Sequence, residues 1–260
     1  MGRIGAGCRG AELVAEAAIS FDKLDLGYDA LRAVSGLSTQ VSKGSLTAVV
    51  GPNGAGKSTL IKAVAGLIAP LQGSLNISAK NSQDIAYLPQ MSEIDRTFPI
   101  TVRELVAMGM WRKVGPLGRF NRARRQELAE AISAVGLTGL EDRMIGTLSG
   151  GQMQRALFAR LLLQDASLVL LDEPFNAVDE KTVKDLIGLV SRWHQEGRTV
   201  LAVLHDYDTV QAHFPNALML ARELVAHGPT PAVLTAENTF KARQMCEACA
   251  DFPHSCGKAA

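Results

Sequence analysis

The chain has 260 residues, a net charge of +1, and a composition that is 47% hydrophobic and 20% charged. These values are ordinary for a globular protein, and the near-zero charge argues against a broad basic surface for nucleic acid or anionic lipid. No apolar run approaches the roughly 18 residues that a membrane-spanning helix needs. The first residues lack the apolar core of a signal peptide, so we expect residues 1–15 to form a disordered lead.

The first strong local pattern is a glycine-rich loop between a predicted strand and a predicted helix. Residues 45–50 are β-branched and apolar, which is typical of a buried parallel strand, and a helix is expected to begin near Lys57. The glycines let backbone N–H groups curl around an anion, and the helix dipole points at the same place. We expect Lys57 to reach the β- and γ-phosphates of a nucleotide and the Ser58 hydroxyl to bind Mg²⁺. The complete Walker A pattern comprises Gly51, Pro52, Asn53, Gly54, Ala55, Gly56, Lys57, Ser58 and Thr59.

After Gln90 the pattern changes from strands to helices. Thr101 and Glu104 form a predicted capping box that opens a helix through Met110, and Asn121 is a predicted cap for a helix that runs to Gly136. Residues 112–125 are rich in Arg and Lys. A solvated loop explains that stretch better than a lipid or nucleic-acid surface does.

A second candidate anion site follows these helices. Ser149, Gly150 and Gly151 offer a hydroxyl and unobstructed amides at the start of a predicted helix. One ATP does not need two such sites on one chain, so the economical interpretation is that Ser149 contacts the γ-phosphate held by another subunit. A plain N-capped helix is the alternative. The whole segment is Leu148, Ser149, Gly150, Gly151 and Gln152.

Two acidic residues end the next predicted strand. Residues 168–171 are continuously apolar, as expected for a central strand covered on both faces, and Pro174 stops the strand directly after Asp172 and Glu173. Ligands of open α/β sheets sit beyond the carboxyl ends of the strands. We therefore expect Asp172 to hold Mg²⁺ and Glu173 to polarise the attacking water.

Together these motifs, in this order, resemble the ATP-binding cassette of ABC transporters over nearly the whole chain. The resemblance implies an α/β P-loop NTPase fold with a mostly parallel central sheet, an N-terminal antiparallel β portion and an inserted α-helical subdomain. It places a single domain at residues 16–240, with the helical subdomain at about residues 91–155. It also implies an ATP hydrolase of the translocase class that uses ATP and Mg²⁺.

The same resemblance assigns roles to further residues. It implies that Tyr28 stacks on adenine, that Gln90 touches Mg²⁺ and water, and that His205 contacts the γ-phosphate as a catalytic residue beside Glu173. Tyr28 has a plain alternative as a core aromatic at a strand end. Residues 176–179 occupy the position of the D-loop, where the family more often has Ser-Ala-Leu-Asp.

Several short sequence segments resemble those of the cassettes of zinc, manganese and iron-chelate importers. The matching segments are residues 87–90, 98–102, 108–109, 174–179 and 223–228. The resemblance implies a second cassette, as a homodimer, a polytopic membrane permease and an extracytoplasmic metal-binding protein, with this chain at the cytoplasmic face of the membrane. We expect a divalent-metal importer, with zinc as first choice and manganese or an iron chelate as alternatives. A soluble ABC ATPase of a non-transport assembly is a third alternative.

The C-terminal segment, residues 241–260, carries an unusual density of possible metal ligands. Cys246, Cys249, His254 and Cys256 could supply a tetrahedral Zn²⁺ site. The spacing is not that of a standard zinc finger, and a frayed, reduced tail is the alternative. If the site exists, it could sense cytosolic zinc.

Overall fold

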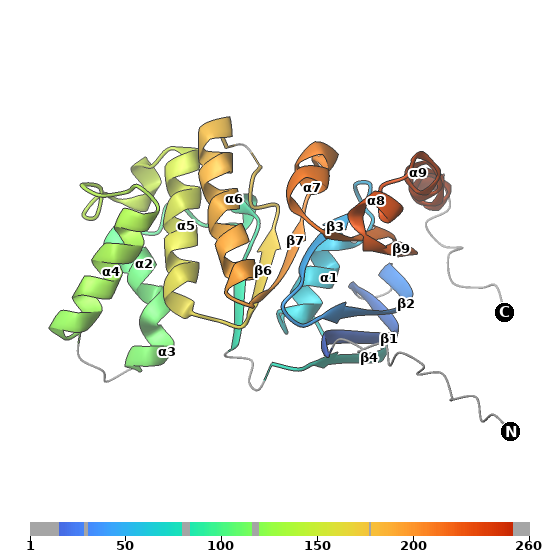
Figure 1. Ribbon diagram of the computed structural model, residues 1–260, viewed down its shortest axis with the longest axis horizontal. Coiled ribbons are helices and arrows are strands. Elements are labelled where there is room, and N and C mark those ends of the chain that lie inside the picture. The colour runs from blue at the N-terminus through green and yellow to red at the C-terminus, as the bar shows by residue number, and fades with distance from the viewer. Residues whose placement is uncertain (1–15, 29–30, 80–83, 116–119, 177, 252–260) are drawn as a thin grey trace, which may run out of the picture.

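The fold comprises two sheets with helices packed around them. It is seen in a computed structural model that describes residues 16–28, 31–79, 84–115, 120–176 and 178–251. The predicted lead, residues 1–15, lies outside these ranges. Figure 1 shows the antiparallel sheet at one end of the molecule and helices α2 to α5 at the other, with the larger sheet between them.

The larger sheet has six strands in the order β5-β6-β7-β3-β8-β9, and only β9 runs antiparallel to its neighbour. The strands β3, β6 and β7 are buried along their whole length, as their unbroken apolar sequences predict. The six strands are β3 (Leu46–Val50), β5 (Ile85–Leu88), β6 (Leu168–Asp172), β7 (Thr199–Val203), β8 (Asn216–Ala221) and β9 (Glu223–Pro229).

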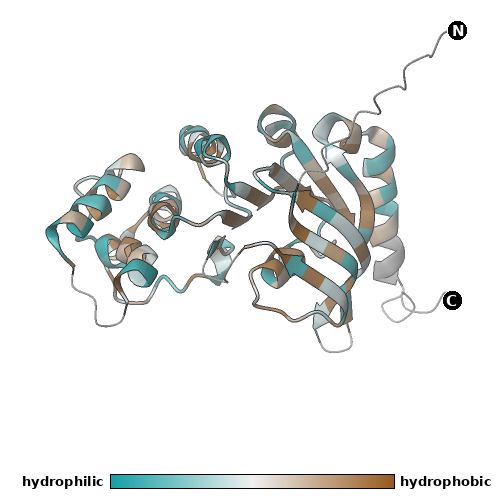
Figure 2. Ribbon diagram, turned by 60° about the horizontal axis from the view of Figure 1, so that its bottom comes forward, coloured by the Kyte–Doolittle hydropathy of each residue, from teal (hydrophilic) through white to brown (hydrophobic). Residues whose placement is uncertain are grey.

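The smaller sheet is antiparallel and covers one face of the larger one. Its order is β2-β1-β4, with β1 (Ala17–Tyr28), β2 (Leu31–Ser42) and β4 (Gln72–Ile77). Successive residues of β3 face opposite cores: Val49 packs with this sheet and with α1 (Lys57–Val64), whereas Ala48 and Val50 pack on the helical side. Figure 2 shows apolar residues concentrated in the strands.

Between β5 and β6 the described residues form helices and short turns. Thr101 caps α2 with both halves of the predicted capping box, and the Asn121 side chain accepts from Arg124 N at the start of α4. These two predictions are confirmed. The helices are η2 (Met91–Glu93), α2 (Val102–Ala107), η3 (Met108–Met110), α3 (Trp111–Val114), α4 (Arg122–Ala134), η4 (Ile145–Thr147) and α5 (Gly150–Gln164).

The C-terminal part adds α6 (Glu180–Gln195), α7 (Tyr207–His213), α8 (Thr230–Val233) and α9 (Ala236–Asp251). The Gly-Pro pair in His227-Gly228-Pro229 predicts a turn, and this prediction is wrong, because β9 continues through these residues to Pro229. Gly228 takes a φ of 143° within this edge strand, and Pro229 stands at its end, where a proline is tolerated. Residue 241, the expected start of the tail, falls inside α9.

Candidate nucleotide site

Three predicted motifs meet at one edge of the larger sheet. The glycine-rich loop follows β3, the two acids end β6, and His205 follows β7. These three strands are neighbours in the order β6-β7-β3, and they run parallel. Their carboxyl ends therefore bring residues from distant parts of the chain to the position where α/β sheets bind ligands.

The glycine-rich loop packs too closely for other residues at two positions. Gly51 has a φ of 144°, and a Cβ there would lie 1.9 Å from the carbonyl oxygen of Leu220. Gly56 has a φ of 91°, and its Cβ would meet Ala33 O at 2.5 Å. The loop thus needs glycine both for its conformation and for its close approach to other backbone.

The loop surrounds a hollow of about 280 Å³ that also reaches the acidic and histidine residues. Gly54 presents open space where a Cβ would stand, so its backbone can be approached directly. The lining residues are Ala33, Asn53, Gly54, Ala55, Gly56, Lys57, Ser58, Thr59, Glu173 and His205. Most of the predicted Walker A residues therefore share one cavity with Glu173 and His205, two of the three predicted catalytic residues; the third, Gln90, does not line it.

Lys57 is buried at the base of the loop. Its Nζ donates to the carbonyl oxygens of Gly51 and Pro52, each at 2.9 Å. Burial lowers the pKa of Lys57, while the nearby charge of Glu173 opposes the shift. An ammonium group held by only two neutral carbonyls can still attract an anion.

Ser58 and Asp172 form a pair of oxygen ligands. Ser58 Oγ donates to Asp172 Oδ1 at 3.0 Å, and the Asp172 side chain is only 1% exposed. Burial raises the pKa of Asp172 to about 6, although the hydrogen bond from Ser58 opposes the shift. Asp172 Oδ2 is buried and has no hydrogen-bond partner among the residues that the structure describes. A hydroxyl and a carboxylate with a free oxygen suit the oxygen-seeking chemistry of Mg²⁺.

Glu173 is held by three side chains. Its Oε1 lies 2.5 Å from His205 Nε2, and its Oε2 accepts from Gln90 Nε2 at 2.7 Å and from Asn176 Nδ2 at 2.6 Å. Burial pushes the pKa of Glu173 up, but the contacts with His205, Gln90 and Asn176 outweigh it and leave the pKa lowered. The backbone of Glu173 is also unusual, with a φ of 50°. The carboxylate is therefore ionised and firmly oriented at neutral pH.

Two features of this cluster go beyond the sequence prediction. The sequence predicts that Gln90 touches Mg²⁺, and this stays a prediction; the structure adds a bond from its amide nitrogen to Glu173, which leaves the amide oxygen for a metal. Asn176 was placed only in the D-loop, and its contact with Glu173 was missed. The signal was available, since an amide three residues after a strand-end acid can fold back onto it.

The second anion site stands apart from the first. Ser149 caps α5 through a capping box, with its Oγ accepting from Gln152 N at 3.2 Å and Gln152 Oε1 accepting from Ser149 N at 3.0 Å. Ser149 is exposed. Among the described residues that line the Walker A hollow, none comes from residues 148–152. The segment thus presents a helix N-terminus to solvent, separate from the Walker A loop.

Tyr28 ends β1, and its ring is 52% exposed. The alternative interpretation, that Tyr28 is a buried core aromatic at a strand end, is therefore wrong. The exposed ring is free to stack on a planar group, although it does not line the hollow around the loop.

The four tail residues are only partly described. Cys246 and Cys249 fall on α9, while His254 and Cys256 lie outside the described residues. Cys246 packs against the core, and burial raises the pKa of its thiol, which disfavours the thiolate that zinc requires. Within the described ranges, no three His, Cys, Asp or Glu side chains form a group suited to a metal ion.

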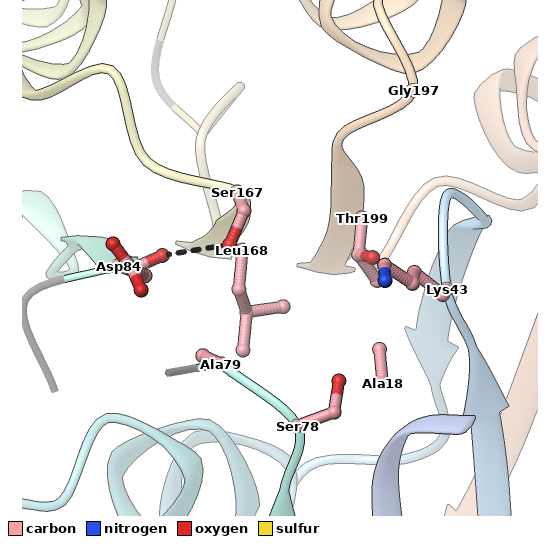
Figure 3. Close-up of a pocket in the computed structure, with 9 residues that line it drawn as sticks. All are labelled: Ala18, Lys43, Ser78, Ala79, Asp84, Ser167, Leu168, Gly197 and Thr199. Carbon is pink, nitrogen blue, oxygen red and sulfur yellow. Dashed lines mark hydrogen bonds between the residues drawn. The ribbon is translucent and has the colours of Figure 1, made fainter. Parts of the chain in front are cut away.

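A second hollow of about 290 Å³ lies at the opposite edge of the sheet (Figure 3). It opens beside Leu168 and Thr199, the first residues of β6 and β7, and Ser167 Oγ donates to Asp84 O at 3.5 Å across its rim. The amino ends of parallel strands are not where this class of sheet binds nucleotides. The site therefore lies at the Walker A edge.

The fold and the site define a P-loop nucleotide-binding protein whose α5 begins at an exposed Ser-Gly-Gly segment. The family model described as ABC transporter matches residues 34–176. The chain therefore belongs to the ABC transporter ATP-binding family. In the part of the chain that is described, no helix has the length and apolar character to cross a membrane.

Relatives cover most of the chain. It is 40% identical to the manganese transport system ATP-binding protein MntB of Listeria monocytogenes over 82% of this chain and 91% of the relative. It is 37% identical to the zinc transport system ATP-binding protein TroB of Treponema pallidum over 89% of each chain. A solved metal-chelate type ABC transporter in an inward-facing conformation matches with a TM-score of 0.75 and 29% identity, over 87% of this chain and 90% of that one.

These likenesses confirm the expected family and fold. They do not favour zinc over manganese, because manganese transport proteins from several bacteria stand beside the zinc protein at similar identity. The expected preference for zinc is therefore not supported, whereas a metal-transport relationship is.

Proposed function

We propose that this chain is the ATP-hydrolysing subunit of an importer for a divalent metal ion, with manganese and zinc as the candidate cargoes. The observation that carries the proposal is the cluster of Glu173, His205, Gln90 and Asn176 beside the Walker A hollow. A metal cargo is supported by relatives of nearly the same length whose names state manganese or zinc transport.

ATP would bind with its phosphates in the Walker A loop. Backbone amides at Gly54 and Gly56 and the Lys57 ammonium would hold the β- and γ-phosphates, and Tyr28 would stack on the adenine. Mg²⁺ would be held by Ser58 and Asp172, with the side-chain oxygen of Gln90 as a further ligand, because the bond from Gln90 to Glu173 uses only the amide nitrogen. The bound ion would neutralise charge on the phosphates.

Glu173 would act as the base for the attacking water. Its lowered pKa keeps it ionised, and its position next to the phosphate loop lets one carboxylate oxygen accept a proton from water. His205 lies at the other oxygen and would orient the carboxylate while its ring faces the γ-phosphate. Water attack on the γ-phosphorus then releases ADP and phosphate.

Two cassettes would share two ATP molecules. Ser149 and the amides of Gly150 and Gly151 form an exposed anion site that does not line the chain's own Walker A hollow. In a head-to-tail homodimer, each such segment would cap the γ-phosphate held by the other subunit. Hydrolysis would then open the dimer.

A polytopic permease would dock on the helical end of the cassette. This end exposes four large apolar side chains, each about half exposed or more: Phe98, Met108, Trp111 and Met144. Exposed apolar side chains of this size are typical of surfaces that bind another protein. Met144 forms an antiparallel bridge with Thr101, and Ile145 N donates to Ile100 O at 3.0 Å, so the segments after Gln90 and before α5 are joined here. With an extracytoplasmic metal-binding protein on the other side, the cassette would work at the cytoplasmic face of the membrane.

The decisive experiment reconstitutes the chain with its permease in liposomes and measures uptake of labelled manganese and zinc. ATP-dependent uptake of either ion that is lost in Glu173→Gln would support the proposal. Uptake of an iron chelate alone would correct the cargo. A chain that hydrolyses ATP but co-purifies with no polytopic membrane protein would favour the alternative of a soluble ABC ATPase.

A further inference from the structure

A buried glutamine joins the helix that follows Ser149 to the peptide that follows Glu173. Gln154 lies on α5 and is 3% exposed. Its Nε2 donates to the carbonyl oxygen of Pro174 at 2.6 Å. Pro174 is the residue directly after Glu173, so one side chain connects the second anion site with the proposed base.

The backbone that this bond holds is strained. Glu173 takes a left-handed φ of 50°, which a non-glycine residue keeps only when its surroundings impose it. On one side its N–H donates to Val203 O at 3.2 Å, and on the other Asn176 N donates to Glu173 O at 3.3 Å. Gln154 adds the hydrogen bond at Pro174, the next peptide along. The orientation of the Glu173 side chain depends on this turn.

Arg155, the residue after Gln154, connects α5 to the start of α6. Arg155 Nη2 donates to Thr182 Oγ1 at 3.0 Å and lies 2.7 Å from Asp185 Oδ2. Thr182 in turn donates from its backbone and side chain to Asp179, the cap of α6. A Cβ at Gly151 would lie 3.2 Å from Asp179 Oδ2, so α5 also approaches this cap closely.

Helix α5 is therefore bonded to the chain near Glu173, through Gln154, and at Thr182, through Arg155. The N-terminus of the same helix is the proposed anion site at Ser149. Any shift of α5 when Ser149 meets a phosphate must move the Pro174 carbonyl or break the bond to it. Buried hydrogen bonds of this kind are kept, because a buried carbonyl without a partner is unfavourable.

We propose that Gln154 is a positioning residue for Glu173, which passes the position of the Ser149 helix to the carboxylate through the Pro174 peptide. This inference rests on the proposed role of Glu173 as base. It gives each ATP site a direct link to the other: Ser149 contacts the partner's nucleotide, and Glu173 acts on the chain's own.

The test replaces Gln154 by methionine, which keeps the length of the side chain and removes the donor. We expect kcat for ATP hydrolysis to fall about tenfold to a hundredfold with little change in ATP affinity, because a small misplacement of a reacting group slows turnover. Gln126→Met makes the same change at an exposed position of α4, where the side chain of Gln126 donates to Glu130, and should leave kcat unchanged. A wild-type kcat in Gln154→Met, or a loss that follows the unfolded fraction in thermal melts, would overturn the proposal.

Gln154→Glu gives a second readout that packing alone would not produce. A neutral carboxylic acid can donate its O–H to Pro174 O, whereas a carboxylate cannot, and burial raises the pKa of such a group. The ratio of its kcat to that of the wild type should therefore rise as pH falls from about 8 to about 6. A ratio independent of pH would contradict the hydrogen-bond role.

Failure of the underlying function can be told from failure of this inference. Glu173→Gln tests the base directly: if it retains full turnover, the proposed role of Glu173 as base is wrong whatever Gln154 does. If Glu173→Gln is inactive and Gln154→Met is fully active, only the positioning role is wrong. Gln154→Met in the Glu173→Gln background should still associate with ATP, since ATP contacts are untouched.

Discussion

Glu173 Oε1 and His205 Nε2 lie 2.5 Å apart although the residues are 32 positions apart in the chain. The contact exists because β6 and β7 are parallel neighbours, so that the residues just beyond their carboxyl ends meet. The histidine occupies one oxygen of the carboxylate, and Gln90 and Asn176 occupy the other. If Glu173 is the base that we propose, the attacking water must share one of these carboxylate oxygens with a partner or displace that partner.

Replacing Glu173 by glutamine should separate ATP binding from turnover. The amide keeps the shape of the side chain but cannot take a proton, so we expect turnover to fall by about 10² to 10⁴ while ATP affinity stays close to that of the wild type. Steady-state phosphate release and nucleotide-binding titrations measure the two quantities. Glu127→Gln, on the exposed face of α4, is a matched control. Wild-type turnover in Glu173→Gln would remove the residue from the mechanism.

Metal-dependent nucleotide binding should weaken in mild acid because of Asp172. Burial raises the pKa of this carboxyl to about 6, and only its ionised form is a good ligand for Mg²⁺. Apparent Mg²⁺ affinity should therefore be steady above that pKa and fall about tenfold per pH unit below it, as protons compete for the carboxylate. Glu173, with its lowered pKa, stays ionised through this range.

Magnesium titrations of ATP binding between neutral and mildly acidic pH test this. ATP itself also takes up protons in this range. The Asp172→Asn variant cannot titrate at this position, so it measures how much of the pH dependence comes from ATP rather than from Asp172. If wild type and Asp172→Asn showed the same pH dependence, Asp172 would not be the titrating ligand.

ATP should join two copies of the chain. The Glu173→Gln protein should elute as a dimer with ATP and as a monomer without it, since two separate anion sites on one chain imply a shared ligand. Adding Ser149→Arg should keep the protein monomeric, because a bulky side chain fills the γ-phosphate contact at the start of α5. Gel filtration with light scattering measures both states. A dimer that ignores ATP and Ser149 would contradict the shared-site arrangement.

The tail cysteines can be tested without shortening α9. We compare zinc content, after reduction and dialysis, in the wild type and in a variant carrying Cys246→Ser, Cys249→Ser, His254→Ala and Cys256→Ser. If the predicted site exists, the wild type should hold one more zinc, and its affinity should fall with pH as thiolates protonate. Equal zinc in both proteins would dismiss the site. The raised pKa of Cys246 works against binding.

Most of the sheet and the site could be predicted from local patterns. The strands β3, β6 and β7 have mostly apolar sequences because both faces are covered. The predicted phosphate- and metal-binding residues lie at their carboxyl ends or just beyond them. The caps at Thr101 and Asn121 depend only on neighbours three residues away, so they too could be recognised.

What escaped prediction depends on contacts between distant residues. The end of β9 contains Gly228 and Pro229, which resemble a turn, yet pairing with β8 carries the strand through them. Gln154 looks like any polar residue on a helix until α5 is packed beside Pro174. The amide of Gln90 points to Glu173 only because β5 and β6 are adjacent. No periodicity encodes these pairings, since each is set by tertiary packing.

Through the close contact between Gly56 and Ala33, the smaller sheet packs against the phosphate loop and supports its conformation. The loop belongs to β3 and α1, but part of the wall behind it is β2. A chain in which the antiparallel sheet has detached would retain every Walker A residue and lose the surface that shapes them. Nucleotide binding therefore requires that the two sheets are packed together. We expect substitutions in β2 that loosen this packing to lower nucleotide affinity, even where they lie far from the phosphates.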